Sequence, residues 1–176
     1  KEYNLLVDQI LGMRFPSVSK GSFQTISTLR MSSSSPCAFY NSFNMPFPKD
    51  FIDPKLNYLI DLIKQKPEER WLIFSEFKKT AEYISNSIND RLILSMSGDS
   101  SIEEREAYAY LFQKEESSVM IMTPVGSEGL DFQVCSNLVN YDLHWNPMRI
   151  EQRIGRIDRI GQKKKFIDIY NFNVRG

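Results

Sequence analysis

The side chains best suited to chemistry are an amide and two guanidiniums in one segment near the end of the sequence. Gln152, Arg156 and Arg159 are separated by four and three residues, a spacing that places them on one face of an α-helix. Two arginines on one face suit a polyanion, because a guanidinium donates in pairs to phosphate oxygens. Spacing alone favours a solvated amphipathic helix without a ligand.

The residues around this trio predict the helix that would position it. Asn146 is suited to cap a helix, and Pro147 fits the first helical turn. At roughly 100° per residue, an apolar stripe falls on the opposite face, about 200° away. That stripe is expected to enter the core and consists of Ile150, Ile154 and Ile157. Gly155 interrupts the helix, and a glycine there predicts that another part of the chain packs close to it.

The composition limits the kinds of partner that the surface can bind. The 176 residues suit one domain, or one domain with an appendage, and the apolar fraction supports a core. Lys plus Arg and Asp plus Glu are balanced at 22 each, so no overall basic field marks a nucleic-acid-binding protein. A nucleic-acid surface must therefore be local, and the basic candidates are Arg149, Arg153, Arg156, Arg159 and the lysines at 163–165.

Cysteine and histidine usage argues against a metal site. Cys37 and Cys135 lie in unrelated contexts and are expected to be free thiols in a reducing compartment. His144, the single histidine, has no Cys, Asp or Glu at ligand spacing. The sequence shows neither a signal peptide nor an apolar run of membrane length. We therefore expect a cytoplasmic protein without a resident metal.

From residue 53 onward, predicted helices and strands alternate. Predicted strands cover 71–75, 92–96, 119–122, 138–141 and 166–172. Helices are expected at 54–66, at 77–88 and, after the capping box formed by Ser101 and Glu104, up to about residue 114. This alternation predicts an α/β domain with a parallel sheet, whose ligands bind at the carboxyl ends of the strands.

Residues 1–52 have a different character and are interpreted as a connector with leading helices. Short helices are expected at 5–11 and 21–31. The serine run at 32–35 before Pro36 is either a flexible linker or part of an ordered connector. The aromatic stretch at 39–51 is either an ordered loop or a mobile connector. The predicted boundary therefore separates a connector at 1–52 from a domain at 53–176.

Two loops at predicted strand ends could bind phosphate. Gly98 follows one strand and permits close approach, and the amides of the next helix could bind a phosphate, although a plain capped helix fits as well. Thr123 and Gly126 follow the next predicted strand in a turn rich in Ser and Gly. Such a turn after a strand is usually only a turn.

The sequence motif of the arginine segment favours a functional site over a solvated helix. Gln-x-x-Gly-Arg-x-x-Arg-x-Gly, from Gln152 to Gly161, resembles the last motif of superfamily 2 helicases and translocases. The extension to Gln162 and the preceding residues 145–147 resemble the Swi/Snf-type branch. Residues 151–156 are most similar to the bacterial subgroup typified by an RNA-polymerase-associated recycling ATPase. Weaker resemblances to the same family cover 28–38, 73–77, 97–105 and 123–132.

The resemblance implies a RecA-like parallel sheet flanked by helices, of the P-loop NTPase type, which is the second motor domain of such an ATPase. It implies that Arg156 and Arg159 act as arginine fingers and that Gln152 bridges to the γ-phosphate or to the facing domain. Gly129, Asp131 and Gly155 would lie near the nucleotide, with Asp131 accepting from a ribose hydroxyl. Many Swi/Snf-type chains lack an acid at that position. Contacts to the nucleic-acid backbone would come from Gly98, Arg105, Thr123 and Gly126.

Two motifs of such an ATPase do not occur in these residues. The sequence contains no Gly-x-x-x-x-Gly-Lys-Ser/Thr loop and no Asp-Glu-x-x motif after a strand. The resemblance, which covers roughly residues 25–176, therefore implies half of a motor that is inactive alone. ATP and Mg²⁺ would be used by the intact enzyme, with the Mg²⁺ ligands in the missing first RecA-like domain.

The partners implied are that first domain in cis, the backbone of double-stranded DNA, and RNA polymerase or another protein on DNA. Two alternatives stay open. One is a non-catalytic RecA-like module that holds nucleic acid or RNA polymerase. The other is a Rossmann-like transferase for a nucleotide sugar, against which the missing Gly-x-Gly-x-x-Gly loop counts.

Overall fold

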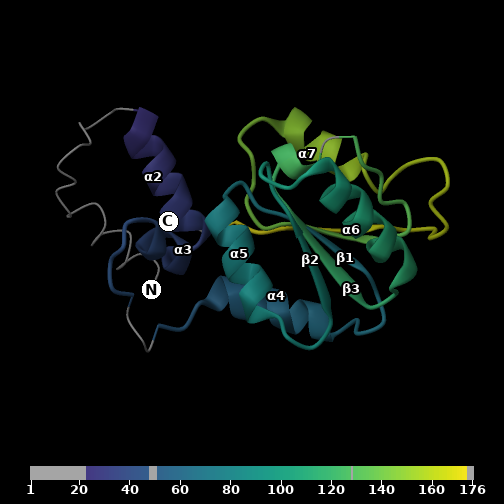
Figure 1. Ribbon diagram of the computed structural model, residues 1–176, viewed down its shortest axis with the longest axis horizontal. Coiled ribbons are helices and arrows are strands. Elements are labelled where there is room, and N and C mark those ends of the chain that lie inside the picture. Colours follow the sequence, from purple (N-terminus) through teal and green to yellow (C-terminus); the bar gives the residue numbers. More distant parts are fainter. Residues whose placement is uncertain (1–22, 48–50, 128, 174–176) are drawn as a thin grey trace.

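Five parallel strands form one sheet at the centre of the molecule, in the order β2-β3-β1-β4-β5. The computed structural model describes residues 23–47, 51–127 and 129–173 (Figure 1). The strands are β1 Trp71–Phe74, β2 Leu92–Met96, β3 Ser118–Met122, β4 Asn137–Asn140 and β5 Asp168–Asn171. The parallel α/β sheet predicted from the alternating pattern is confirmed.

Helices begin where the sequence places capping residues. They are α2 Phe23–Ser34, α3 Pro36–Ser42, α4 Pro54–Lys64, α5 Lys78–Ser87, α6 Ile102–Lys114 and α7 Pro147–Ile154. The Ser101 side chain accepts from the amide of Glu104, whose carboxylate accepts from the amide of Ser101, so the predicted capping box is complete. The Asn146 side chain caps α7 by accepting from the amide of Met148 at 3.0 Å.

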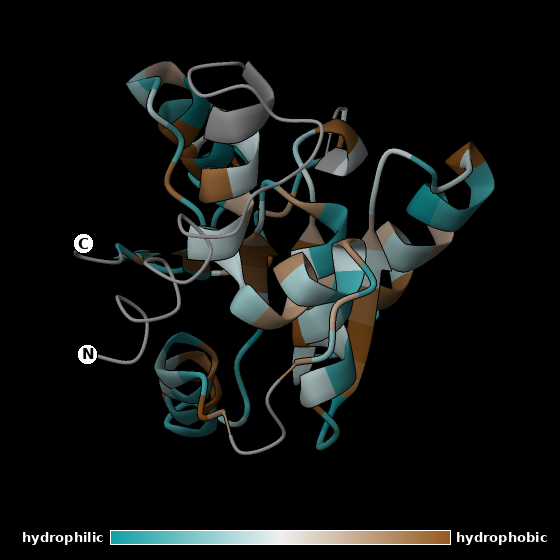
Figure 2. Ribbon diagram, turned by 90° about the vertical axis from the view of Figure 1, so that its left-hand side faces the viewer, coloured by the Kyte–Doolittle hydropathy of each residue, from teal (hydrophilic) through white to brown (hydrophobic). Residues whose placement is uncertain are grey.

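Helices cover both faces of the sheet. Successive side chains of a strand point to opposite sides, and those of β1 are apolar on both sides, so both faces must be buried. Trp71 and Ile73 of β1 pack with α4 and α5 on one face. Leu72 and Phe74 pack on the other face with Phe112 of α6 and with Ile157. The central strands are the most hydrophobic part of the ribbon in Figure 2. This two-sided burial holds the carboxyl ends of the strands in fixed positions.

The arginine segment differs from its prediction. Helix α7 ends at Ile154, and residues 155–161 continue as turns. In a longer α-helix the Arg156 carbonyl would accept from the amide of residue 160. Here that carbonyl accepts at 2.8 Å from the amide of Phe132, which lies in the loop after β3. The prediction of one helix carrying both Arg156 and Arg159 is therefore wrong.

Gly155 is the residue at which α7 ends, and its surroundings differ from the prediction. Its φ is −61°, a value that any residue adopts. Among the described residues, a methyl group added at Gly155 would meet only two carbonyls of its own helix within 4 Å, at 3.4 and 3.7 Å. The expectation that another segment packs closely against Gly155 is wrong.

The connector is more helical than predicted. Helix α2 continues through Ser32 and Ser33 to Ser34, so the serine run is not a flexible linker. Helix α3 takes up the first part of the aromatic stretch and buries Phe39 and Tyr40. In Figure 1, α2 and α3 lie at one side of the sheet, next to α5. The helix expected at 5–11 lies outside the described residues.

None of the helices in the described part of the chain has both the length and the apolar character that crossing a lipid bilayer requires.

Two glycine-to-alanine substitutions test this packing. A Cβ at Gly126 would lie 2.9 Å from the backbone carbon and oxygen of Met96, so Gly126→Ala must displace backbone and should lower the free energy of unfolding by about 1–3 kcal/mol. Gly155→Ala is the matched control and should leave that free energy unchanged or raise it by up to about 1 kcal/mol. Urea unfolding of both variants measures the difference. Equal changes in the two variants would contradict the close contact between Gly126 and the backbone of Met96.

Candidate functional site

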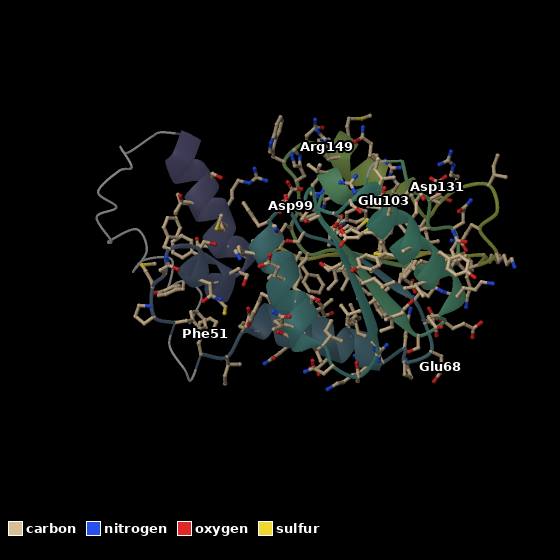
Figure 3. All side chains as sticks on the ribbon, viewed as in Figure 1. Phe51, Glu68, Asp99, Glu103, Asp131 and Arg149 are labelled. Carbon is tan, nitrogen blue, oxygen red and sulfur yellow. The ribbon has the colours of Figure 1, made fainter. Side chains whose placement is uncertain are left out.

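The predicted site residues gather at the carboxyl end of the sheet. Figure 3 shows Asp99, Arg149 and Asp131 along one end of the molecule, whereas Glu68, in the turn before β1, lies at the opposite end. The predicted residues lie in the loops after β2 and β3, in the first turn of α6, or on α7 and the turns after it. Parallel topology therefore brings together side chains that are far apart in the sequence.

A cavity of about 580 Å³ lies beside α7 at this end. Two of the predicted catalytic residues, Gln152 and Arg156, line it together with Arg149. The remaining lining comes from Phe74, Glu76, Pro124, Val125, His144 and Arg153. Gln152 and Arg149 are exposed, so the cavity presents amide and guanidinium donors to solvent.

Arg156 is tied to the loop after β3. Its Nη1 donates to the carbonyl oxygen of Leu130 at 3.0 Å, and its own carbonyl accepts from Phe132. These two bonds run in opposite directions between the same two segments. They fix where the arginine segment passes the loop that carries Gly129 and Asp131.

Arg159 and Asp131 form an ion pair with each other and do not line the cavity. The arginine side chain is 54% exposed, and a surface pair of this kind is worth about 0–1 kcal/mol. Gly129, two residues earlier, is exposed and has a φ of +78°, in the left-handed region that favours glycine. The predicted partners of the nucleotide are thus close together, with Asp131 engaged by a cation.

The residues predicted to contact nucleic acid come together in two touching loops, after β2 and after β3. A Cβ at Gly98 would lie 3.3 Å from Cγ1 of Val125, and Gly126 packs on the backbone of Met96. The amide of Thr123 donates to the Met96 carbonyl at 3.1 Å, and Thr123 is buried. These loops can therefore offer backbone groups to a ligand as one unit.

Arg105 holds the loop at Gly98 in place. Its Nε donates to the Ser100 carbonyl at 3.1 Å, and its Nη2 to the carbonyls of Ser97 and Gly98 at 3.4 Å. The start of α6 carries Glu103 and Glu104 and a complete capping box. Two carboxylates repel an anion there, so the start of α6 is interpreted as a plain capped helix, and the groups available to a phosphate in this region are those of the loop at Gly98.

Arg153 has a role that the sequence interpretation missed. The local basic surface predicted from the sequence includes Arg153, but this residue is only 5% exposed. Its Nη1 donates to Asn140 Oδ1 at 3.0 Å and to the Asp142 carbonyl at 2.9 Å, and its Nη2 is paired with Glu76. Burial lowers the pKa of Arg153, and the carboxylates of Glu76 and Asp142 oppose that shift.

The position of Arg153 relative to the isoleucines of the same helix could have predicted its burial. Arg153 lies three residues after Ile150 and four before Ile157, so it belongs to the same helical face as the isoleucine stripe. A charge on an apolar face requires a buried partner. The partners follow adjacent strands: Phe74 is paired with Asn140 in register, which places Glu76 and Asp142 side by side.

The remaining titratable candidates are structural. His144 Nδ1 accepts from the amide of Asn146 at 3.0 Å, just before α7. Cys37 and Cys135 are free thiols, as predicted, and burial raises the pKa of Cys135 to about 12. A thiol with so high a pKa is not a nucleophile.

Comparisons with known proteins identify the family and the fold. The family model described as the helicase conserved C-terminal domain matches residues 54–161. The RNA polymerase-associated protein RapA of Vibrio cholerae is 39% identical over 123 residues, which are 67% of this chain and 13% of that protein. The uncharacterized ATP-dependent helicase YqhH of Bacillus subtilis is 39% identical over 121 residues, which are 64% of this chain and 20% of that protein. The chain thus spans a fifth or less of these relatives.

Solved structures give the same fold. The C-terminal part of the Fun30 ATPase domain superposes with a TM-score of 0.61 over 96% of this chain and 60% of that one, at 20% identity. The C-terminal domain of the DEAD-box protein Dbp5 has a TM-score of 0.59 over 69% of this chain and 71% of that one, at 28% identity. The chain therefore belongs to the helicase conserved C-terminal domain family and is a RecA-like domain of the superfamily 2, RapA-like type.

Proposed function

We propose that this domain completes the ATP site of a two-domain, DNA-stimulated motor. The observation that carries the proposal is the cavity beside α7, where Gln152 and Arg156 lie together at the carboxyl end of a parallel sheet. The touching loops at Gly98 and Thr123 lie at the same end. One end of the domain thus offers donors for a nucleotide and backbone groups for nucleic acid.

The donors of the cavity fit a triphosphate. Arg149, Gln152 and Arg156 contribute only N–H donors and one amide oxygen, and the Glu76 carboxylate is neutralised by Arg153. Bound ATP would supply the transferable phosphoryl group, and the first RecA-like domain would supply the phosphate loop and the Mg²⁺ ligands. Arg156 would stabilise the charge that develops on the phosphoryl oxygens.

Arg159 would act from outside the cavity. Its pair with Asp131 is exposed and weak, so a phosphate can replace that carboxylate at little cost. Asp131 would then be released to accept from a ribose hydroxyl. Closure of the two domains on ATP would make this exchange, and Gly129 gives the loop the backbone conformation that it needs.

The loops at Gly98 and Thr123 would track a duplex backbone. Backbone contacts position a protein on nucleic acid without reading its bases, so no sequence specificity is expected. Double-stranded DNA is preferred to RNA because the most similar branch acts on DNA. RNA polymerase on DNA is a proposed partner, since a relative with 39% identity is described as associated with that enzyme.

Replacing one guanidinium tests the catalytic part. In the intact two-domain protein, Arg156→Ala should lower ATP turnover by about 10³–10⁵-fold and leave DNA affinity unchanged, because an arginine finger acts on transition-state charge. Lys114→Ala, an exposed cation at the end of α6, is the matched control and should retain full turnover. Turnover and DNA binding are measured on the same preparations.

Unchanged turnover in Arg156→Ala would contradict the finger assignment. If the wild-type protein binds DNA without hydrolysing ATP, the domain is the non-catalytic binding module instead. Family membership leaves the nucleotide-sugar transferase alternative without support.

Replacing Arg105 tests the nucleic-acid part. Its guanidinium holds the loop at Gly98, so Arg105→Ala should weaken binding to unrelated duplex sequences by the same factor. The slope of log affinity against log salt should stay constant, since a lost phosphate contact would reduce it by about one. Fluorescence anisotropy at several salt concentrations measures both. Unchanged affinity, or a loss confined to one sequence, would contradict the role.

A further inference from the structure

The end of the connector helix α2 is bonded to the carboxyl edge of the sheet. Ser34 is 2% exposed, and its Oγ donates to Asp142 Oδ2 at 2.8 Å. The hydroxyl of Thr80 lies 2.8 Å from the same Oγ. Because Ser34 has one proton and gives it to the carboxylate, Thr80 must be the donor of the second bond. These buried bonds join residues 46 and 108 positions apart in the sequence.

The Asp142 carboxylate collects donors from three elements. Besides Ser34, its Oδ2 accepts from Ser75 Oγ at 2.8 Å and from the Glu76 amide at 3.0 Å, both after β1. Its Oδ1 accepts from Lys55 Nζ, in α4, at 3.2 Å. Burial lowers the pKa of Lys55, and the Asp142 charge opposes that shift.

Lys55 binds the end of the connector helix α2 as well as Asp142. Its Nζ also donates to the carbonyls of Ser34 at 3.0 Å and Ser33 at 3.4 Å, the last residues of α2. A helix end leaves such carbonyls without intrahelical partners. The ammonium therefore binds both the end of α2 and Asp142, and it lies over the Tyr141 ring at 4.1 Å from the centroid.

The same junction holds the arginine segment. The Asp142 carbonyl accepts from Arg153 Nη1, and the Glu76 carboxylate pairs with Arg153 Nη2. Arg30 of α2 approaches the other Glu76 oxygen at 3.9 Å. Helix α2 thus contacts both acidic residues that hold Arg153. Arg156 lies only three residues after Arg153, so its position depends on the same contacts.

We propose that Asp142 is a positioning residue that couples α2 to α7, so that the placement of the connector sets the orientation of Gln152 and Arg156. The coupling rests on the proposed function, in which the preceding domain is attached through this connector. Movement of α2 changes the donors around Asp142, and Arg153 transmits the change to α7. The segment from Arg30 to Ser35, which belongs to neither the nucleotide site nor the DNA site, would then transmit the position of α2 to α7.

Two serines of α2 provide a matched test in the intact protein. Ser34→Ala removes the bond to Asp142. Ser32→Ala is the control, because Ser32 is equally buried and its Oγ, among the described residues, bonds only the Leu29 carbonyl of its own helix. Hydrogen exchange followed by mass spectrometry reports the opening of α7, with α6 as an internal reference. We expect about fivefold faster exchange in α7 for Ser34→Ala, the equivalent of one lost hydrogen bond, and none for Ser32→Ala.

Equal exchange of α7 in the two variants would overturn the coupling. Faster exchange in α6 as well would also overturn it, since that would mean a general loss of stability. Where ATP turnover is present, Ser34→Ala should lower kcat and leave KM for ATP unchanged. Absence of turnover in the wild-type protein overturns the proposed function but leaves the exchange result, and hence the coupling, standing.

Discussion

A guanidinium cannot lose its proton in a protein, so burying Arg153 requires carboxylates and carbonyls that surround it. The sheet supplies them, because the paired strands β1 and β4 end in register and release Glu76 and Asp142 side by side. Arg153 joins both residues to α7. Removing one partner would leave a charge buried alone, which is far costlier than losing an exposed pair. The position of α7 over the sheet edge depends on this cluster.

The functional groups follow from that position. With α7 held by Arg153, the neighbouring Gln152 is directed into the cavity, and the chain leaves the helix at Ile154 in turns. Those turns meet the loop after β3, where the Arg156 side chain donates to the Leu130 carbonyl and the Arg156 carbonyl accepts from the Phe132 amide. The buried Arg153 thus supports the partly buried Arg156, which lines the cavity. This division between supporting and presented cations is what a preorganised electrostatic site requires.

Much of the fold could be predicted from local patterns. Short apolar runs predicted the first four strands, an alternating pattern predicted the fifth, and Asp53, Ser101 and Asn146 predicted helix starts, because these features depend on a few neighbouring residues. The end of α7 could not be predicted, since it depends on a bond from Phe132, 24 positions earlier in the sequence.

The site was predicted unevenly for the same reason. Gln152 and Arg156, which the helicase-like motif predicts in one site, both line the cavity beside α7, whereas the pairing of Arg159 with Asp131 depends on tertiary contact. The residue type of Arg153 is typical of a protein surface, whereas its position on the isoleucine face predicts burial. A charged residue on an apolar stripe requires acidic partners, and here these follow the neighbouring strands β1 and β4.

ATP hydrolysis by this chain alone, compared with the same chain joined to the preceding part of the protein, tests the central claim most directly. Both are measured with and without double-stranded DNA, after a cooperative unfolding transition has shown that each is folded. The account predicts no turnover by the chain alone in either condition and DNA-stimulated turnover once the preceding part is present. Clear hydrolysis by these 176 residues would mean that they contain a complete phosphate site, and it would contradict the assignment of Arg156 to a site shared with another domain.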